Sequence, residues 1–593
     1  MSRALQPLPY RLARRLIGPN VYFAGTGTAL ETAAGQVFEL EALHRWEALV
    51  RQALAHLGWP SDALYRHRHA SGATLAFAAP LDQLHTATAL NVWAWWIASG
   101  STAEPLHAPG DAATWDADAA LRTLQASAAA EAQPTLLALQ RETRARALPF
   151  LLDEDELTLG SGTGARSWFT DELPDPARVP WPALHRIPTA LVTGSNGKTT
   201  TTRLLAALCQ SHGWDTAYCC TDGVFFEGQA LDSGDFSGPA GAREALRQGR
   251  AQAAVLEAAR GGLLRHGLAV EQADVAVVTN VAHDHFGEFG VHDLHTLAQV
   301  KLSVARAIGV GACLVLNADD DFLRRQASSL SCPLAWFALD FDQPLLQLQR
   351  ALHKPACGVR GDHLWLALAG IEHDLGPTLA MPLSLGDHAR YNLGNLAAAA
   401  LAGALLGIAP TTIARVLAQF GHDPRDNPGR LQHWMFGATR VVVDYAHNPE
   451  GLRSLLDALD AGQRTGRLGL LLGHAGNRED ADLRAVAQVA AGYAPERVVL
   501  KELPGYARGR DANAVPAVMQ AQLLADGLDP QRLSLEPDEV DAARTLLAWA
   551  REGDLLVLPV HELANRARVV ALLDAMAASG WRVGDAVPEI AAV

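Results

Sequence analysis

The sequence is poor in cysteine and has no long apolar run, and these two absences exclude several classes of protein. Six cysteines in 593 residues are too few for a disulfide framework, and no pair has the CxxC spacing of a zinc ribbon. No stretch approaches the roughly 18 consecutive apolar residues of a membrane span, and no apolar segment follows the basic N-terminus as in a signal peptide. We therefore predict a cytoplasmic protein without a membrane partner.

Positive charge is also scarce. Lys and Arg number 49 against 64 Asp and Glu, which gives a net charge of −15. A nucleic-acid surface needs clustered Lys and Arg, so no nucleic-acid partner is expected. Hydrophobic residues make up 49% of the chain and are spread along it, which indicates a globular protein. At roughly 100–200 residues per domain, three or four domains are expected.

Apolar strands alternate with helical stretches in two parts of the chain. The first part contains TALVTG, AQAAVLEA, ADVAVVTN and ACLVLNA, and the second contains RVVVDYA, LGLLLGH, RVVLKE and DLLVLPV. This alternation is typical of parallel α/β sheets. We predict an α/β protein with a P-loop parallel-sheet central domain over residues 166–425 and a C-terminal Rossmann-like domain over 426–593.

The N-terminal domain, residues 1–165 with a linker, is predicted to be mixed α/β. The short runs VYFAG and ATLAFAA have β-strand composition, and helices are expected near 40–59 and 84–98. Residues 98–115 are rich in Gly, Pro, Ser and Ala, which is typical of a linker. One Ala-rich helix is predicted over roughly 116–147.

The segment TALVTGSNGKTTTTRLLAALCQ has the order strand, glycine-rich turn, helix. Glycines allow a backbone to fold closely around an anion, and a helix N-terminus points free N–H groups at it. Lys198 would reach the outer phosphates of ATP and the Thr199 hydroxyl would ligate Mg²⁺. Val192 stands where the strict Walker pattern has glycine, so a plain turn entering an ordinary helix is the alternative. The predicted ATP-binding residues of the loop are Gly194, Ser195, Asn196, Gly197, Lys198, Thr199 and Thr200.

Further motifs follow the loop in an order that resembles a known family. They are LEAARGGLLRHGL, ADVAVVTNVAHDHFG, VLNADDD, NPGRL, VVDYAHNPEGL and RGRDA. Together they resemble the Mur ligase superfamily, which includes the peptidoglycan-precursor ligases, and within it the Mur-ligase-like half of the cyanophycin synthetases. The segment RALPFLLDEDELTLGSGTG resembles the end of the N-terminal domain of those synthetases. Here it runs almost directly into the phosphate loop, so their ATP-grasp domain is expected to be missing.

The resemblance implies a site for two Mg²⁺ ions, with Thr199, Glu257 and His285 as metal ligands. A carboxylate at a strand end beside a phosphate loop suits a hard cation, whereas imidazole is not a ligand that Mg²⁺ prefers. Lys301 matches a lysine that CO₂ carbamoylates in many Mur ligases, which would turn it into a catalytic, metal-facing carboxylate. A solvated surface position is the alternative for Glu257 and for Lys301.

Three further residues are nucleotide contacts by the same resemblance. Asn317 matches an adenine contact, with capping of a helix in this segment as the alternative. Arg430 matches an arginine that reaches the ATP phosphates, as a catalytic group, when the domains close. Asp444 matches a nucleotide-contacting aspartate of the C-terminal domain.

The remaining candidates lie around the ends of later predicted elements. His447 follows a strand end and is a candidate catalytic proton acceptor, with a nearby carboxylate as the alternative. Arg508 and Arg510 either hold a substrate carboxylate or form a solvated face. Asn392 and Asn395 match the start of a family helix, and a structural role is expected for them.

These residues predict an ATP-dependent, ADP-forming amide ligase that works through an acyl phosphate. Its partners would be an amino acid or amine and the carboxylate of a peptide or polymer, and a homo-oligomer is left open. An accessory subunit that binds a full-length cyanophycin synthetase or its polymer is the first alternative. A P-loop kinase that stops at phosphoryl transfer is the second.

Overall fold

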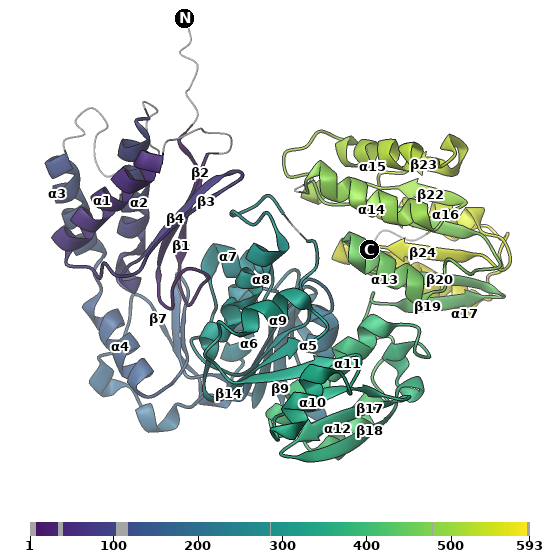
Figure 1. The fold of residues 1–593 in the computed structure, drawn as a ribbon, viewed down its shortest axis with the longest axis horizontal. Helices are drawn as coiled ribbons and strands as arrows, with labels where there is room; N and C mark the ends of the chain where they lie inside the picture. The colour runs from purple at the N-terminus through teal and green to yellow at the C-terminus, as the bar shows by residue number, and fades with distance from the viewer. Residues whose placement is uncertain (1–7, 34–39, 102–116, 285, 477, 590–593) are drawn as a thin grey trace, which may run out of the picture.

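The computed structural model describes residues 8–33, 40–101, 117–284, 286–476 and 478–589. In Figure 1 the N-terminal part (purple) and the C-terminal part (green to yellow) stand on either side of the central part (teal). The mixed α/β N-terminal part and the two parallel-rich sheets that follow confirm the predicted fold class.

The N-terminal part is an antiparallel sheet with helices packed on one face. Its strand order is β1-β2-β4-β3, and α1, α2 and α3 lie together beside the sheet (Figure 1). Trp46, Trp93 and Trp95 are buried in the core between these layers. The elements are β1 (Tyr10–Leu16), β2 (Gly27–Thr32), α1 (Leu40–Leu57), β3 (Leu64–His69), β4 (Gly72–Ala78), α2 (Leu84–Ser99) and α3 (Ala117–Glu131).

Two expectations for the N-terminal part are wrong. The run VYFAG forms a turn, because Asn20 Oδ1 accepts hydrogen bonds from the N–H groups of Tyr22 and Phe23 at 3.0 and 3.1 Å. The long Ala-rich helix is two helices, since α3 ends and α4 (Pro134–Ala145) begins at a proline, which lacks an N–H and disfavours helical geometry before it. Most of the predicted linker, residues 102–115, lies outside the described residues.

A small antiparallel sheet joins the N-terminal part to the central one. It consists of β5 (Phe150–Leu152), β6 (Glu156–Leu159) and β7 (Arg166–Phe169). Only short turns separate β7 from the first central strand, β8 (Thr189–Thr193). The described chain therefore has no room for an ATP-grasp domain at this point, as predicted.

Among the described residues, eleven strands form the central sheet, in the order β11-β10-β9-β12-β8-β13-β14-β15-β16-β17-β18. The seven strands from β9 to β16 in that order are parallel, and antiparallel hairpins extend both edges. Its other strands are β9 (Thr216–Cys220), β10 (Gly223–Phe226), β11 (Gln229–Ser233), β12 (Ala253–Glu257), β13 (Ala273–Val278), β14 (Ile308–Asn317), β15 (Leu334–Ala338), β16 (Ala356–Arg360), β17 (His363–Leu368) and β18 (Ile371–Pro377).

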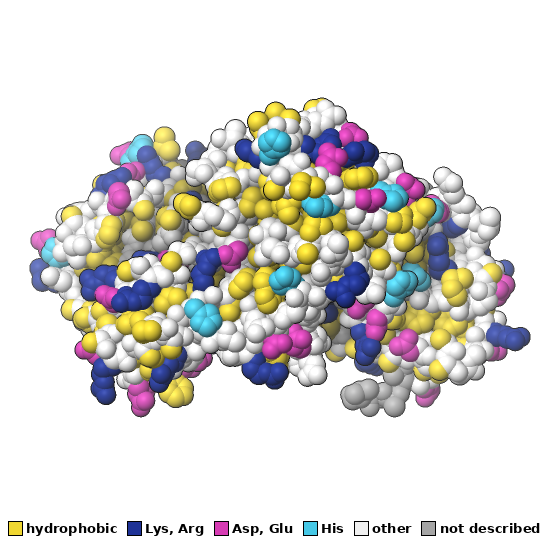
Figure 2. Space-filling view, turned by 90° about the horizontal axis from the view of Figure 1, so that it is seen from below, with side chains coloured by type: hydrophobic (Ala, Val, Ile, Leu, Met, Phe, Trp, Pro, Cys, Tyr) yellow, Lys and Arg dark blue, Asp and Glu magenta, His cyan; other side chains and the backbone are white. Residues whose placement is uncertain are grey.

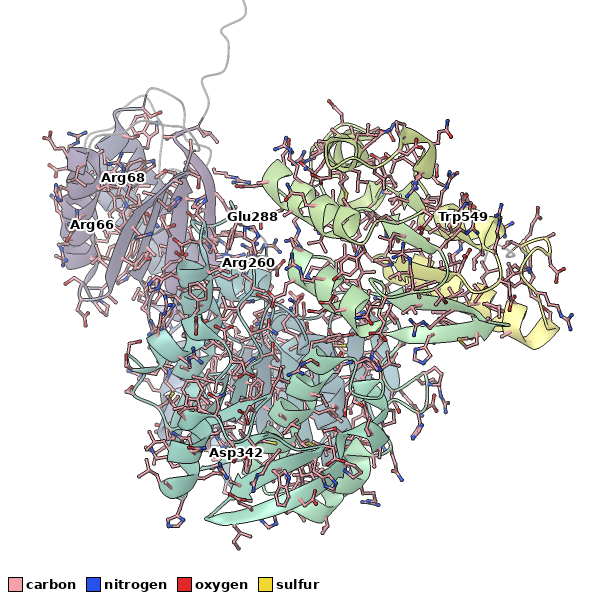
Figure 3. All side chains as sticks on the ribbon, turned by 45° about the vertical axis from the view of Figure 1, so that its right-hand side comes forward. Arg66, Arg68, Arg260, Glu288, Asp342 and Trp549 are labelled. Atoms are coloured by element: carbon pink, nitrogen blue, oxygen red, sulfur yellow. The ribbon has the colours of Figure 1, made fainter. Side chains whose placement is uncertain are left out.

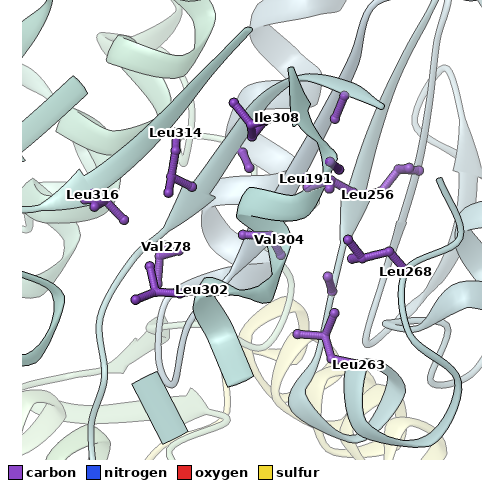
Figure 4. Close-up of a cluster of buried hydrophobic side chains, with 14 of the residues drawn as sticks. Leu191, Leu256, Leu263, Leu268, Val278, Leu302, Val304, Ile308, Leu314 and Leu316 are labelled. Carbon is purple, nitrogen blue, oxygen red and sulfur yellow. The ribbon is translucent and has the colours of Figure 1, made fainter. Parts of the chain in front are cut away.

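Helices cover both faces of the central sheet, which is why its parallel strands are apolar on both sides. Figure 4 shows Leu191, Leu256 and Val278 from neighbouring parallel strands packed in one cluster with Leu263 of α7 and Leu302 of α8. The helices are α5 (Lys198–His212), α6 (Pro239–Arg247), α7 (Arg260–His266), α8 (Leu294–Leu302), α9 (Asp321–Ala327), α10 (Pro344–Ala351), α11 (Arg390–Leu405) and α12 (Pro410–Leu417).

The C-terminal sheet has the order β19-β20-β24-β21-β22-β23, and all its pairs except β19–β20 are parallel. This is the expected Rossmann-like arrangement. Its elements are β19 (Gln432–Phe436), β20 (Thr439–Asp444), α13 (Pro449–Ala458), β21 (Leu468–Leu472), α14 (Asp480–Gly492), β22 (Arg497–Leu500), α15 (Ala514–Ala525), β23 (Leu533–Leu535), α16 (Glu539–Trp549), β24 (Leu555–Pro559) and α17 (Leu563–Ser579).

The surface agrees with the charge pattern of the sequence. On the face shown in Figure 2, Lys and Arg side chains are interspersed with Asp and Glu side chains. Across the described ranges, no helix has both the length and the apolar character that a membrane crossing requires.

Candidate active site

The phosphate loop lies between β8 and α5, and two glycines give it its shape. Gly194 has φ +149°, and a Cβ there would stand 1.8 Å from Thr279 Oγ1. Gly197 has φ +81°, and a Cβ there would stand 2.1 Å from Asn395 Oδ1. L side chains rarely adopt such conformations, so both positions require glycine. The loop ends at the N-terminus of α5, whose free N–H groups can bind phosphate.

The loop is held against the segment that follows β13. Asn196 N–H donates to Asn280 Oδ1 at 2.9 Å, and the Asn196 carbonyl accepts from Thr279 Oγ1 at 2.6 Å. Ser195 Oγ donates to the Ala282 carbonyl at 2.9 Å. These bonds use the loop's own polar groups and make the loop rigid. The Lys198 side chain lies at the cleft, and its ammonium donates to the Ser195 carbonyl at 3.1 Å.

Glu257 ends β12 and is buried between two threonine hydroxyls. Thr199 Oγ1 donates to Glu257 Oε2 at 2.9 Å, and Thr221 Oγ1 donates to Oε1 at 3.0 Å. Burial raises the pKa of Glu257, and the Lys198 ammonium opposes that shift. Carboxylate and hydroxyl oxygens are the ligands that Mg²⁺ prefers, so this donor set fits one hard cation beside the phosphate loop.

The predicted second metal position is only partly described. Lys301, at the end of α8, is buried, so a solvated position is wrong for it. Burial, followed by repulsion from Lys198, lowers the pKa of Lys301 well below its ordinary value. His285 lies outside the described residues. Among the residues that are described, no group of three or more His, Cys, Asp or Glu side chains is arranged to hold a metal.

The C-terminal domain contributes the opposite side of the site, from the end of β20. Asp444 Oδ2 accepts from Leu431 N–H at 2.7 Å and its Oδ1 from Ala446 N–H at 2.8 Å. The Arg430 guanidinium lies 4.2 Å from the ring centroid of Tyr445, within cation–π range. Asp444 and Arg430 thus meet at the start of this domain, facing the phosphate loop.

His447 lies a few residues beyond Asp444. Its Nε2 is 3.8 Å from Asp284 Oδ1 of the central domain, and its Nδ1 is 3.2 Å from the Tyr445 carbonyl. Burial lowers the pKa of His447 to about 4. The imidazole is therefore neutral near pH 7, which is the form that accepts a proton.

Direct contacts join the two sides. Asn448 caps α13 by accepting from Gly451 N–H at 2.7 Å, and its Nδ2 donates to Asn196 Oδ1 of the phosphate loop at 2.8 Å. Arg478 donates to Asp284 at 2.8 Å, and both side chains are buried. The C-terminal domain is therefore docked on the phosphate loop.

A buried aspartate forms a second junction between the domains. Asp222 lies between β9 and β10, and its carboxylate pairs with Arg203 of α5 at 3.2 Å and with Arg566 of α17. Arg430 lies 3.9 Å away. Burial alone would raise the pKa of Asp222, but Arg430, Arg566 and Arg203 together hold it well below its ordinary value. We name these four residues the Asp222 cluster.

An open cleft lies between the two sides, with about 870 Å³ of empty space that is partly continuous with solvent. It brings together the predicted loop residues from Ser195 to Thr200 with Arg430, Asp444 and His447. Lining residues that sequence reasoning missed or treated as structural are Thr221, Asn280, Tyr391, Asn392, Asn395, Asn427, Tyr445, Glu450 and Ser454.

Some predicted residues do not line the cleft. Asn317 ends β14, where its Nδ2 donates to the Thr279 carbonyl at 2.9 Å, and its neighbour Asp320 caps α9. Arg510 is partly buried and its guanidinium is bonded within its own domain, because it donates to the Gly476 carbonyl at 2.8 Å and to Asp480 at 2.7 Å. Asn392 and Asn395 line the cleft because they start α11 against Gly197, a proximity that linear sequence does not show.

A phosphate loop that faces a Rossmann-like domain across a cleft defines a nucleotide-dependent α/β enzyme. Sequence signatures agree, since the Mur ligase middle domain matches residues 192–403 and the Mur ligase, glutamate ligase domain matches 429–559. The UDP-N-acetylmuramoyl-L-alanyl-D-glutamate–2,6-diaminopimelate ligase of Ectopseudomonas mendocina is 32% identical over 63% of this chain and 72% of its own. The chain belongs to the Mur ligase family and is an ATP-dependent ligase of that type.

Cyanophycin synthetases are also similar. The Synechocystis sp. enzyme is 34% identical over 54% of this chain, and the Geminocystis herdmanii enzyme is 32% identical over 63%. This chain spans only 36% and 42% of the lengths of those two relatives. Among solved structures, E. coli FolC in complex with ADP is 19% identical with a TM-score of 0.49, over 66% of this chain and 90% of its own.

Proposed function

We propose that the chain joins an amino acid or amine to a carboxylate through an acyl phosphate, in the manner of the ligase half of a cyanophycin synthetase. The observation that supports this most directly is the cleft, in which the phosphate loop faces Arg430, Asp444 and His447, with Glu257 bonded to Thr199 behind the loop. By similarity to the cyanophycin synthetases, the acceptor is an aspartate side chain of a peptide or polymer and the amine is an amino acid such as arginine.

A carboxylate needs activation because its anionic oxygen leaves badly. In the proposed reaction, a substrate carboxylate oxygen attacks the γ-phosphorus of ATP, and the bond to ADP breaks. The amine then attacks the acyl carbon, the carbon–oxygen bond to phosphate breaks, and the amine loses a proton. Lys198 and Arg430 stabilise the transferring charge, while Asp444 and the N-terminus of α5 hold the nucleotide.

Thr199 and Glu257 would hold one Mg²⁺, which would polarise the outer phosphate oxygens when bound. A second Mg²⁺ near Lys301 and His285 is part of the proposal by family similarity. The low pKa of Lys301 supports a carbamate there, because CO₂ reacts with the uncharged amine. His447 is the proposed acceptor of the amine proton, since it is neutral and lines the cleft.

We also propose domain boundaries at 165/166, within the β5–β7 sheet that joins the N-terminal and central parts, and at 425/426. Separate apolar cores support the division, one between the N-terminal sheet and its helices and others on the two faces of the C-terminal sheet. Closure of the C-terminal domain on the central one would exclude water from an acyl phosphate held between them.

The test is ADP release in a screen of amino acids against aspartate-containing peptides, with mass spectrometry of the product. Lys198→Ala should lower ADP formation by about 100-fold or more, as loss of a charge that stabilises the transition state does. Lys354→Ala, an exposed lysine of the central domain, is the matched control and should leave the rate unchanged. Undiminished turnover in Lys198→Ala would overturn the assignment of the loop.

The alternative is an accessory subunit of a full-length cyanophycin synthetase. The observation in its favour is the short passage from β7 to β8, which leaves no ATP-grasp domain between them. The site geometry is against it, because a decayed site would not keep Thr199 and Thr221 bonded to a buried Glu257. Co-purification with a synthetase, with no ADP formed for any substrate pair, would favour the accessory role.

A further inference from the structure

One loop of the central domain is in contact with both flanking domains. We name it the docking loop and define it as residues 283, 284 and 286–292. It follows β13 and leads into α8. In Figure 3 Glu288 of this loop and Arg260, its partner at 2.6 Å, lie between the N-terminal part and the C-terminal part.

The N-terminal domain holds the end of the docking loop through the β3–β4 hairpin. Ser71 Oγ, in the turn of that hairpin, lies 2.8 Å from His292 Nε2 and 3.1 Å from His69 Nδ1. Gly290 packs so closely on the hairpin that a Cβ there would stand 2.7 Å from the His69 ring. The hairpin therefore touches the loop by both a polar bridge and close packing.

One choice of histidine tautomers satisfies every partner in the bridge. His69 Nε2 lies 3.5 Å from a carboxylate oxygen of Glu31, which favours a proton on Nε2 and makes Nδ1 an acceptor. Ser71 then donates to His69 Nδ1, and its oxygen accepts the N–H of His292 Nε2. Burial, followed by the neighbouring His69, lowers the pKa of His292. The His292 ring is therefore neutral and carries the single N–H that these hydrogen bonds need.

The β3–β4 hairpin is itself held in place, so its contact with His292 can fix the position of the docking loop. Glu31 pairs with Arg14 at 2.9 Å, and Thr74 donates to it at 2.7 Å. Arg14 also donates to the Leu264 carbonyl of α7 at 2.8 Å, and its guanidinium lies 4.8 Å from the ring of Phe289 in the docking loop. Both side chains of the Arg14–Glu31 pair are buried.

The C-terminal domain meets the other end of the same loop. Arg478 donates to Asp284 at 2.8 Å, and His283 lies 3.2 Å from Asp482. Gly287 is so close to Glu479 that a Cβ would stand 2.1 Å from its carboxylate. A shift of the loop would therefore displace the groups on which the C-terminal domain docks.

We propose that the N-terminal domain positions the docking loop for the C-terminal domain, with Ser71 as the positioning residue of the contact. The idea rests on the proposed function only in that the docked domains form the ligase cleft. The N-terminal domain, none of whose described residues lines the cleft, then acts on the ligase site without touching substrate. Loss of this contact should weaken docking of the C-terminal domain and so lower kcat, without changing the affinity for ATP.

The test compares full-length Ser71→Ala with wild type by hydrogen exchange and by kinetics. Amide exchange in residues 286–292 should become faster by about 2- to 13-fold, the change expected when one net hydrogen bond is lost. The kcat for ADP formation should fall by a similar factor while the KM for ATP stays the same. Ser71→Thr, which keeps the hydroxyl, should restore both, and Ser61→Ala, an exposed serine of the same domain, should change neither.

His292→Ala removes the other partner of the Ser71 hydrogen bond and tests the same contact. If the bridge carries the effect, combining it with Ser71→Ala should add nothing further to the loss caused by either change alone. Wild-type exchange of the loop in a folded Ser71→Ala protein would overturn the inference. Because exchange is read without turnover, a chain that forms no amide at all would refute the proposed function and leave this measurement intact.

Discussion

Replacing Asp222 by asparagine should weaken the docking of the C-terminal domain on the central one. The carboxylate balances Arg203 from its own domain and Arg566 from α17, with Arg430 at 3.9 Å, and all of these side chains are largely buried. Removal of one partner from a buried ion pair costs about 3–5 kcal/mol, because the remaining charge stays out of water. Opening of the interface returns the arginines to solvent, so the cost falls on the docked arrangement.

A cost of about 3–5 kcal/mol shifts the balance between docked and open forms by roughly 100- to 4,000-fold. We expect a larger radius of gyration by small-angle X-ray scattering and a matching loss of ADP formation in Asp222→Asn. The control is Asp342→Asn, at the far end of the central domain in Figure 3, where a half-exposed ion pair with Arg350 at 2.7 Å is worth about 0–1 kcal/mol.

The pH dependence has a definite sign. The pKa of Asp222 is lowered in the folded protein, so its contribution is present above the unfolded value of about 3.9 and is lost as pH falls from there through the lower folded pKa. The difference between wild type and Asp222→Asn should therefore be constant from pH 8 to pH 5. Equal scattering profiles and equal rates for the two proteins at pH 7 would refute the reasoning.

Single contacts at Glu257, Gly194 and Lys501 also lead to measurable effects. Glu257→Gln keeps the shape but removes the charge, so the Mg²⁺ midpoint for ADP formation should rise by about 10-fold or more; an unchanged titration would contradict the metal assignment. Gly194→Ala places a Cβ 1.8 Å from Thr279 Oγ1, which should strain the loop by about 1–3 kcal/mol. The affinity for ATP, measured by calorimetry, should fall accordingly. Wild-type affinity would show that the loop relaxes without strain. Lys501→Met leaves Glu539 buried without its ammonium, which should cost about 3–5 kcal/mol and lower the calorimetric midpoint of the C-terminal domain, whereas an unshifted transition would rule this out.

Much of the fold was predictable because its signals are local. The strand sequences from TALVTG to DLLVLPV are runs of apolar residues between helices, and each became a parallel strand. The phosphate loop was predictable for the same reason, since Gly194 and Gly197 are required by the backbone at those positions. The turn at Asn20 and the break at Pro134 were missed although their signals are also local, because β-strand composition and helical composition on either side outweighed them.

The site was less predictable, because its partners come from distant parts of the chain. Lys301 lies on a helix whose sequence is equally consistent with a solvated face, and only the packing shows that it is buried. Arg510 was a candidate for holding a carboxylate, yet its donors are used by Gly476 and Asp480. Asn392 and Asn395 were taken as structural, whereas the start of α11 brings them to the cleft.

The sequence by itself determined the phosphate loop, the alternation of strands and helices, and the family motifs, since each depends on residues close together in the chain. The tertiary structure alone decided that Asp222 joins α5 to α17 and that Ser71 meets His292 across 221 residues. The physical reason is that a buried charge or hydroxyl is defined by the partner it finds on folding. Neither residue type nor spacing in the sequence specifies that partner.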